Sequence, residues 1–145
     1  MIKIICIGKL KEKYLSEFVD DYKNRVGKYH KISIIELKEE KTVDVEADNI
    51  MKHINKNDYV ITCDIGGNQI DSVQLSKLID MTFINHSTIV FIIGSSDGLS
   101  DKIKQISNYS LSLSKCTFPH GVFRAVLLEQ IYRSFKIINN ETYHK

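Results

Sequence analysis

The feature that most constrains the fold of this chain is a repeated alternation of short apolar runs with longer amphipathic segments. The strongest run, STIVFIIG at residues 87–94, is rich in β-branched residues, too short for a helix and typical of a strand buried on both faces. Strands that alternate with helices build a mostly parallel sheet sandwiched by helices. We therefore expect an α/β fold of that kind. Strands are expected at residues 2–8, 31–37, 58–67, 87–94 and 109–114, and helices at 11–29, 45–55, 73–84, 101–107 and 119–137.

Local signals set several boundaries. Asp71 or Ser72 can cap the third helix. A Gly-Gly turn at residues 66–67 closes the third strand. Pro119 suits the first position of the last helix, where its missing N–H costs nothing.

Composition favours one domain over residues 1–145. The chain has one Pro, no linker-like stretch, 43% hydrophobic and 26% charged residues. Its opening apolar run is too short for a signal sequence or a membrane span, so a cytoplasmic protein with no membrane partner is expected. The three cysteines are far apart and form no C-x-x-C pair, which argues for reduced thiols and against a metal site.

Charge is unevenly distributed along the chain. Residues 1–31 hold eight Lys and Arg against four acids, and residues 102–145 hold seven against two. Residues 32–101 hold five against twelve. If the two ends of the chain meet in space, they form one basic face suited to nucleic acid; otherwise the charges are simply solvated.

In open parallel sheets, ligands bind at the carboxyl ends of the strands. Those ends are expected at Gly8-Lys9, Cys63-Asp64, Gly94-Ser95 and Ser114-Lys115.

The last helix carries a cation on its apolar face. His120 and Arg124 are one turn apart and fall on the same side as Leu127, Leu128 and Ile131. An unpaired buried guanidinium costs several kcal/mol, so Arg124 must meet a carboxylate, a phosphate or a wet cleft. A structural ion pair would satisfy it, but two polar groups stacked at a helix start beside a strand end favour a functional site.

Two other readings stay open. GSSDG at residues 94–98 matches G-x-S-x-G and would make Ser96 the nucleophile of a serine hydrolase, with Asp101 or Glu129 and His144 as partners. A Gly-rich turn that approaches a ligand is the simpler interpretation. The chain could also be a ribosome- or RNA-binding module without catalysis.

Three stretches carry a family resemblance: IVFIIGSSDGLS, YSLSLSKCTFPHGVFRAVLLEQIYRSFKI and the terminal YHK. Together with the opening IGKLKEKYLSEFVDDYKNRV they resemble the RlmH family of SPOUT methyltransferases over nearly the whole chain. The resemblance implies a homodimer with a C-terminal trefoil knot, whose apolar last helix packs at the knot and the dimer interface. It also implies an S-adenosylmethionine-dependent enzyme that methylates N3 of a pseudouridine in the 23S rRNA of assembled ribosomes.

The resemblance also implies which residues act. The cofactor would be held by Cys63, Gly94, Leu113, Ser114, Lys115, Cys116, Thr117 and Phe118. His120 and Arg124 would point into the cleft between cofactor and RNA. The base would be His120 or His144 of the partner subunit, unless solvent takes the proton and no base is needed. RNA contacts are expected from Lys9, Lys11, Lys13, Lys115, Arg124, Tyr143 and His144.

This chain departs from the family pattern at two places. Gly94-Ser95 replaces the usual Gly-Gly, and residues 38–50 are shorter than the corresponding stretch of the family.

Overall fold

A computed structural model describes all residues 1–145. Five strands form one sheet in the order β2-β1-β4-β3-β5, and every pair of neighbours is parallel. The strands are β1 (Ile2–Ile7), β2 (Ile32–Leu37), β3 (Tyr59–Gln69), β4 (Ile89–Ile93) and β5 (Tyr109–Ser112). The expected α/β fold with a parallel sheet is confirmed.

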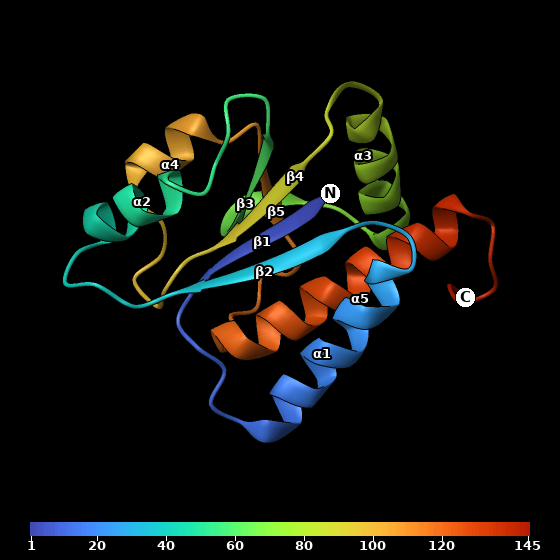
Figure 1. Cartoon of the computed structure of the whole chain (residues 1–145), viewed down its shortest axis with the longest axis horizontal. Coiled ribbons are helices and arrows are strands. Elements are labelled where there is room, and N and C mark those ends of the chain that lie inside the picture. Colours follow the sequence, from blue (N-terminus) through green and yellow to red (C-terminus); the bar gives the residue numbers. More distant parts are fainter.

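Helices cover both faces of the sheet (Figure 1). One face carries α1 (Lys13–Gly27), α3 (Ser72–Asn85) and α5 (His120–Ile138), and the other carries α2 (Val43–Met51) and α4 (Asp101–Ile106). Successive residues of a strand point to opposite faces, so Ile4 and Cys6 join the larger core cluster while Ile5 and Ile7 join the smaller one. Both faces of β4 are buried, as its sequence predicts.

Asp71 caps α3 through a capping box with Gln74, as expected. The prediction for the end of β3 is wrong. The strand does not stop at the Gly-Gly pair but continues to Gln69, and its pairing with β5 shifts between Cys63 and Asn68. Gly67 explains this, because a Cβ there would lie 2.8 Å from the backbone carbon of Ser110. The glycine permits close approach within a sheet, which a local reading takes for a turn.

The apolar face of the last helix packs within its own chain. Leu127, Leu128 and Ile131 belong to the core formed with the sheet, and a dimer interface on this helix stays a prediction. The helix packs between α1 and α3. The two basic ends of the chain therefore do meet, because α1 and α5 lie side by side. The trefoil knot stays a prediction.

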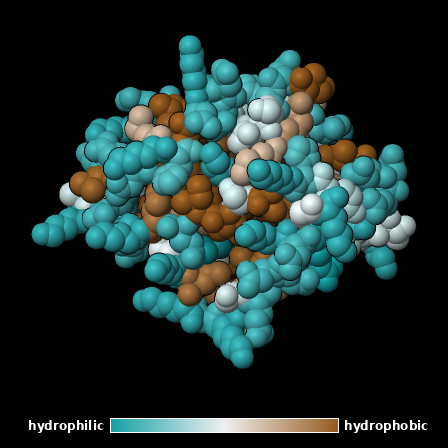
Figure 2. All heavy atoms as spheres, in the orientation of Figure 1, coloured by the Kyte–Doolittle hydropathy of each residue, from teal (hydrophilic) through white to brown (hydrophobic).

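The face seen in Figure 2 is largely hydrophilic, with a hydrophobic area near its middle where Figure 1 places the edge strand β2. No helix combines the length and the apolar character that a membrane crossing requires.

Candidate functional site

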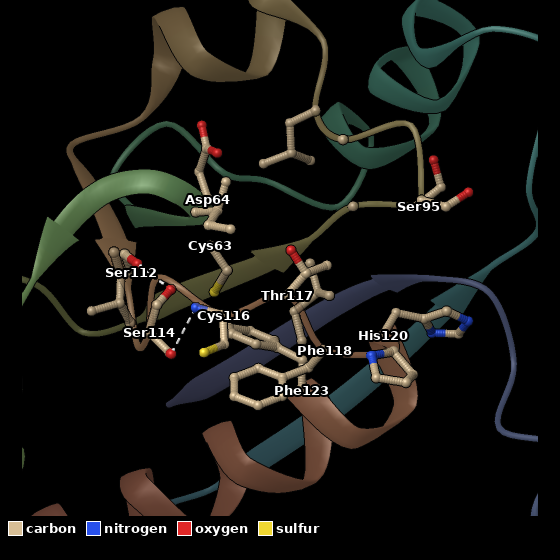
Figure 3. A pocket seen from close by; sticks show the side chains of 18 residues that line it. Cys63, Asp64, Ser95, Ser112, Ser114, Cys116, Thr117, Phe118, His120 and Phe123 are labelled. Carbon is tan, nitrogen blue, oxygen red and sulfur yellow. Dashed lines mark hydrogen bonds between the residues drawn. The ribbon is translucent and has the colours of Figure 1, made fainter.

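A cavity of about 420 Å³ opens at the carboxyl ends of β4 and β5 and at residues 63–65 of β3, where the pairing of β3 with β4 ends (Figure 3). Its volume is within the range of sites for small organic ligands, and its position is the usual one for a parallel sheet. Three segments line it: residues 63–65 of β3, the turn after β4 and the peptide that joins β5 to α5. The lining residues are Cys63, Asp64, Ile65, Ile93, Gly94, Ser95, Ser96, Gly98, Leu99, Leu111, Ser112, Ser114, Cys116, Thr117, Phe118, Pro119, His120 and Phe123.

Most of the residues expected around a cofactor meet in this cavity. Those that line it are Cys63, Gly94, Ser114, Cys116, Thr117 and Phe118. Leu113 and Lys115 do not. Leu113 packs against the hydrophobic core, and Lys115 is exposed to solvent. Asp64 also lines the cavity; the sequence places it at an expected strand end but does not mark it as a cofactor-binding residue.

The glycine turn, residues 94–100, forms one wall. A Cβ on Gly94 would lie 2.6 Å from the carbonyl oxygen of Gly98, so no larger residue fits without moving the turn. Gly98 has φ +83°, a conformation that favours glycine, and its N–H donates to the carbonyl of Ser95 at 2.9 Å. The two glycines therefore allow the backbone at Gly94 and the backbone at Gly98 to lie in direct contact.

The opposite wall is the peptide after β5, whose conformation is fixed by hydrogen bonds within the segment. Ser112 Oγ donates to the carbonyl of Ser114 at 3.0 Å, and the Cys116 N–H donates to Ser114 Oγ at 2.9 Å (Figure 3). The cavity surface combines apolar side chains with small polar groups and backbone. Asp64 supplies its one carboxylate, which accepts from the Gly66 N–H at 3.2 Å and lies 3.7 Å from Lys104.

His120 lies at the margin of this group, away from Cys63 and Ser114 (Figure 3). It begins α5, with Pro119 as the N-cap one position before the place predicted for it. The ring packs against Gly8, where a Cβ would lie 3.0 Å from Cε1, and Gly8 has φ +105°. A glycine at the end of β1 therefore makes room for the imidazole.

Arg124 occupies a different place from the one expected. Its Nη1 donates to Glu36 Oε2 at 2.6 Å and its Nη2 donates to the carbonyl of Gly8 at 3.0 Å. The residue is 1% exposed and does not line the cavity. A carboxylate partner was expected and is present, but the guanidinium points to the ends of β1 and β2 instead of the cleft. The position in a cleft between cofactor and RNA is thus corrected to a buried ion pair.

Burial and pairing shift several pKa values near the site. Burial alone would raise the pKa of Glu36, but the hydrogen bonds from Arg124 and from the Leu10 N–H outweigh it, so this pKa lies below its ordinary value. Burial raises the pKa of Cys6 to about 12 and raises that of Cys63 as well. Both thiols are therefore neutral: Cys6 is part of the hydrophobic core, and Cys63, which lines the cavity, is suited to packing against a ligand rather than to nucleophilic attack.

The C-terminal tail is ordered against its own chain. Tyr143 donates to Glu129 at 2.9 Å and its hydroxyl lies 3.1 Å from that of Tyr22, while His144 Nδ1 lies 3.2 Å from Arg133 Nη1. Glu129 and Arg133 lie on α5, about 14 Å and about 20 Å along the helix axis from His120. Within one chain, Tyr143 and His144 therefore lie far from His120.

The expected basic residues are all exposed: Lys9 and Lys11 lie in the connection between β1 and α1, and Lys13 is the first residue of α1. Leu10 lies against the start of α5, since a Cβ on Gly121 would be 3.1 Å from its side chain. The lysines thus sit beside the same end of α5 as His120.

A hydrolase triad around Ser96 is not assembled. Ser96 is exposed on the glycine turn and makes no hydrogen bond to a histidine or carboxylate, and His144 is bonded to Arg133. Nor do three or more His, Cys, Asp or Glu side chains converge in a way that could hold a metal ion.

Comparison with known proteins identifies the family. Residues 1–144 match the model of a predicted SPOUT methyltransferase family. A putative ribosomal RNA large subunit methyltransferase H from Methanococcus maripaludis is 48% identical over 157 residues, covering 99% of each chain. The ribosomal RNA large subunit methyltransferase H of Caldicellulosiruptor saccharolyticus is 44% identical over 154 residues, covering 100% of each. These alignments are longer than the 145-residue chain, so the relatives have residues that this chain lacks.

Solved structures show the same fold at low sequence identity. A probable methylase family protein from Haemophilus influenzae has a TM-score of 0.55 at 12% identity, covering 99% of this chain and 70% of its own. The SpoU methyltransferase AviRb from Streptomyces viridochromogenes has a TM-score of 0.53 at 10% identity, covering 98% of this chain and 62% of its own. With its parallel sheet, its cavity at the strand ends and full-length relatives of this kind, the chain belongs to the RlmH family of SPOUT methyltransferases.

Proposed function

We propose that this enzyme transfers a methyl group from S-adenosylmethionine to N3 of a pseudouridine in large-subunit rRNA, and that it acts on assembled ribosomes in the cytoplasm. The observation that carries the proposal is the cavity at the carboxyl ends of β4 and β5 and at residues 63–65 of β3, with His120 at its margin. Relatives that match over their whole length are named as methyltransferases of large-subunit ribosomal RNA.

The cavity suits this cofactor in both size and lining. Its apolar part, which includes Phe118 and Leu99, can cover an adenine ring, while backbone groups of the glycine turn and of residues 112–116 offer hydrogen bonds. Gly94 lets the Gly98 carbonyl lie directly against its Cα, and this contact sets the shape of the wall that would face the cofactor. Asp64 is the carboxylate available to a cationic or hydroxyl group of the ligand.

Bound S-adenosylmethionine supplies an electrophilic methyl on a sulfonium. The chain's own task is then alignment: the target nitrogen must be held in line and about 3–3.5 Å from that carbon. An imide N3 carries a proton and has no free lone pair until the proton leaves. A histidine nitrogen at the margin of the cavity can accept it, which makes His120 our first candidate for the base.

Tyr143 and His144 would join such a site from a second copy of the chain, because in their own chain Glu129 and Arg133 hold them about 14–20 Å along α5 from His120. We therefore propose a homodimer in which each tail completes the partner's site. Tyr14 and Phe18 support it: they lie one turn apart on α1 and are 68% and 39% exposed. Large apolar groups on one helix face are typical of an interface.

RNA binding would rest on a modest number of contacts. Lys9, Lys11 and Lys13 flank the start of α5, and the whole chain has a net charge of only +2. Contacts to phosphates make affinity fall with salt concentration in proportion to their number. A weakly basic enzyme of this kind gains from the additional surface that an assembled ribosome presents.

The composite site can be tested by mixing two inactive variants. His120→Ala and His144→Ala chains would each lose methyl transfer as homodimers. If His144 acts across the interface, co-expressed chains form heterodimers with one intact site, and about a quarter of wild-type activity returns on random pairing. If His144 serves its own chain, the mixture stays inactive, because no chain then carries both histidines. Nucleoside analysis of the labelled rRNA identifies the modified base and atom.

A further inference from the structure

We propose that Glu46 of α2 is a positioning residue that tethers the glycine turn and so sets the affinity for S-adenosylmethionine without touching it. The inference rests on the proposed function of the cavity. It concerns a helix that lies outside the cavity and carries none of its lining residues.

Glu46 is a buried carboxylate that accepts hydrogen bonds from two uncharged donors. It is 4% exposed. Its Oε1 accepts from Ser95 Oγ at 3.0 Å, and its Oε2 accepts from the Glu40 N–H at 3.0 Å. No lysine or arginine pairs with it. A carboxylate taken out of water in this way depends on those two hydrogen bonds, which are of the strong, charge-assisted kind.

The second end of the turn is held by the same helix. Ser100 Oγ donates to Asp44 Oδ1 at 2.6 Å and also accepts from the Lys102 N–H, as the N-cap of α4. Ser95 and Ser100 thus bracket the turn, and both are bonded to carboxylates of α2. Between them, residues 96–98 are exposed and make no side-chain hydrogen bond.

The bracketed turn has little freedom to shift without changing the cavity. Gly94 and Ser95 both line the cavity, and the Gly94 Cα faces the Gly98 carbonyl so closely that even a methyl group is excluded. A sideways movement of Ser95 would therefore alter the wall against which the cofactor is placed. Glu46 prevents that movement from behind the wall.

The experiment measures the Kd of S-adenosylmethionine by calorimetry for the wild type, Ser95→Ala, Glu46→Gln and the double variant. We expect each single variant to raise Kd about tenfold, the factor equivalent to 1.4 kcal/mol. The double variant should resemble the singles, because both changes act on the same Ser95–Glu46 bond: Ser95→Ala removes its donor, and the glutamine has no charge and one acceptor oxygen for two donors. Ser95→Thr keeps the hydroxyl and should bind the cofactor with wild-type affinity. In methyl transfer, KM for the cofactor should rise with Kd while kcat at saturation stays within about twofold.

Asp48→Asn is the matched control. It removes an acid from the same helix, but Asp48 bonds only to Lys102, away from the turn, so Kd should not change. Wild-type Kd in the Ser95→Ala and Glu46→Gln proteins would overturn the inference, as would fully additive effects in the double variant. If Glu46→Gln fails to fold, Ser95→Ala and Ser95→Thr carry the test. Failure of the wild type to bind the cofactor would instead refute the proposed function.

Discussion

Replacing Arg124 should reduce stability far more than it reduces cofactor binding. The guanidinium is buried and bonded to Glu36 and to the Gly8 carbonyl, and it lines no part of the cavity. Arg124→Met keeps the apolar stem and removes the charge. An arginine that served RNA would give the opposite pattern, with unchanged stability and lost methyl transfer.

The expected loss of unfolding free energy follows from the two groups that lose their partner, Glu36 and the Gly8 carbonyl. Removing one partner of a buried ion pair costs about 3–5 kcal/mol. Glu36 is a partial exception, because 34% of its side chain is exposed and the Leu10 N–H still donates to it at 3.2 Å. The Gly8 carbonyl also loses a donor, at about 1–3 kcal/mol if no water replaces it. We therefore expect a loss of about 3 kcal/mol, and about half as much for Arg124→Lys, which cannot form both bonds.

The same pair predicts a pH dependence. The pKa of Glu36 is lowered in the folded chain, so the stability from its ionised form is fully present above its ordinary value of 4.5. That stability is lost as pH falls through the lower, folded value. The difference in unfolding free energy between wild type and Glu36→Gln should accordingly be constant at neutral pH and shrink below about pH 4.5.

Urea unfolding followed by circular dichroism measures both quantities, with calorimetry of cofactor binding at a temperature where each variant is folded. We expect Kd for S-adenosylmethionine in Arg124→Met to stay within about twofold of the wild type. A variant as stable as the wild type, to within about 0.5 kcal/mol, would refute the structural role assigned to this arginine.

Two further predictions concern the cavity. Gly94→Ala should abolish detectable cofactor binding, because its Cβ would lie 2.6 Å from a backbone oxygen of the turn. Gly27→Ala, whose Cβ would have nothing within 4 Å, should bind the cofactor normally. Calorimetry measures both, and equal binding by the two variants would contradict the assignment of the glycine turn as a wall of the cofactor site. Iodoacetamide at pH 8 should alkylate exposed Cys116 well before Cys63, whose pKa is raised by burial. S-adenosylmethionine should slow the reaction at Cys116, which lines the cavity. Mass spectrometry gives the order of modification, and faster labelling of Cys63 would contradict this prediction.

The sequence predicts the fold well because its signals are local and repeated. β4 is apolar along its whole length, and the Asp71 cap marks the start of α3. The cavity is foreseeable for a related reason: parallel strands bring their carboxyl ends together, so Cys63, Gly94 and Ser114 meet there.

What the sequence does not show depends on contacts between distant segments. Arg124 and Glu36 are 88 residues apart, and nothing near either residue marks the other as its partner. The helical periodicity places Arg124 on a buried face and so predicts that it needs a counter-charge, but it does not identify Glu36 as that partner. Gly67 was misread for the same reason, since its need for space comes from Ser110 on another strand. Glu46 gave no signal, because its role comes from the distant Ser95.

Transfer of labelled methyl from S-adenosylmethionine to ribosomes that lack this modification tests the central claim most directly. Naked 23S rRNA serves as the parallel substrate, and the Gly94→Ala enzyme as the control. We predict label on N3 of a pseudouridine in the large-subunit RNA of assembled ribosomes, little on naked RNA, and none with the control enzyme. Absence of label from ribosomes, with cofactor bound to the wild-type enzyme, would contradict the proposed substrate.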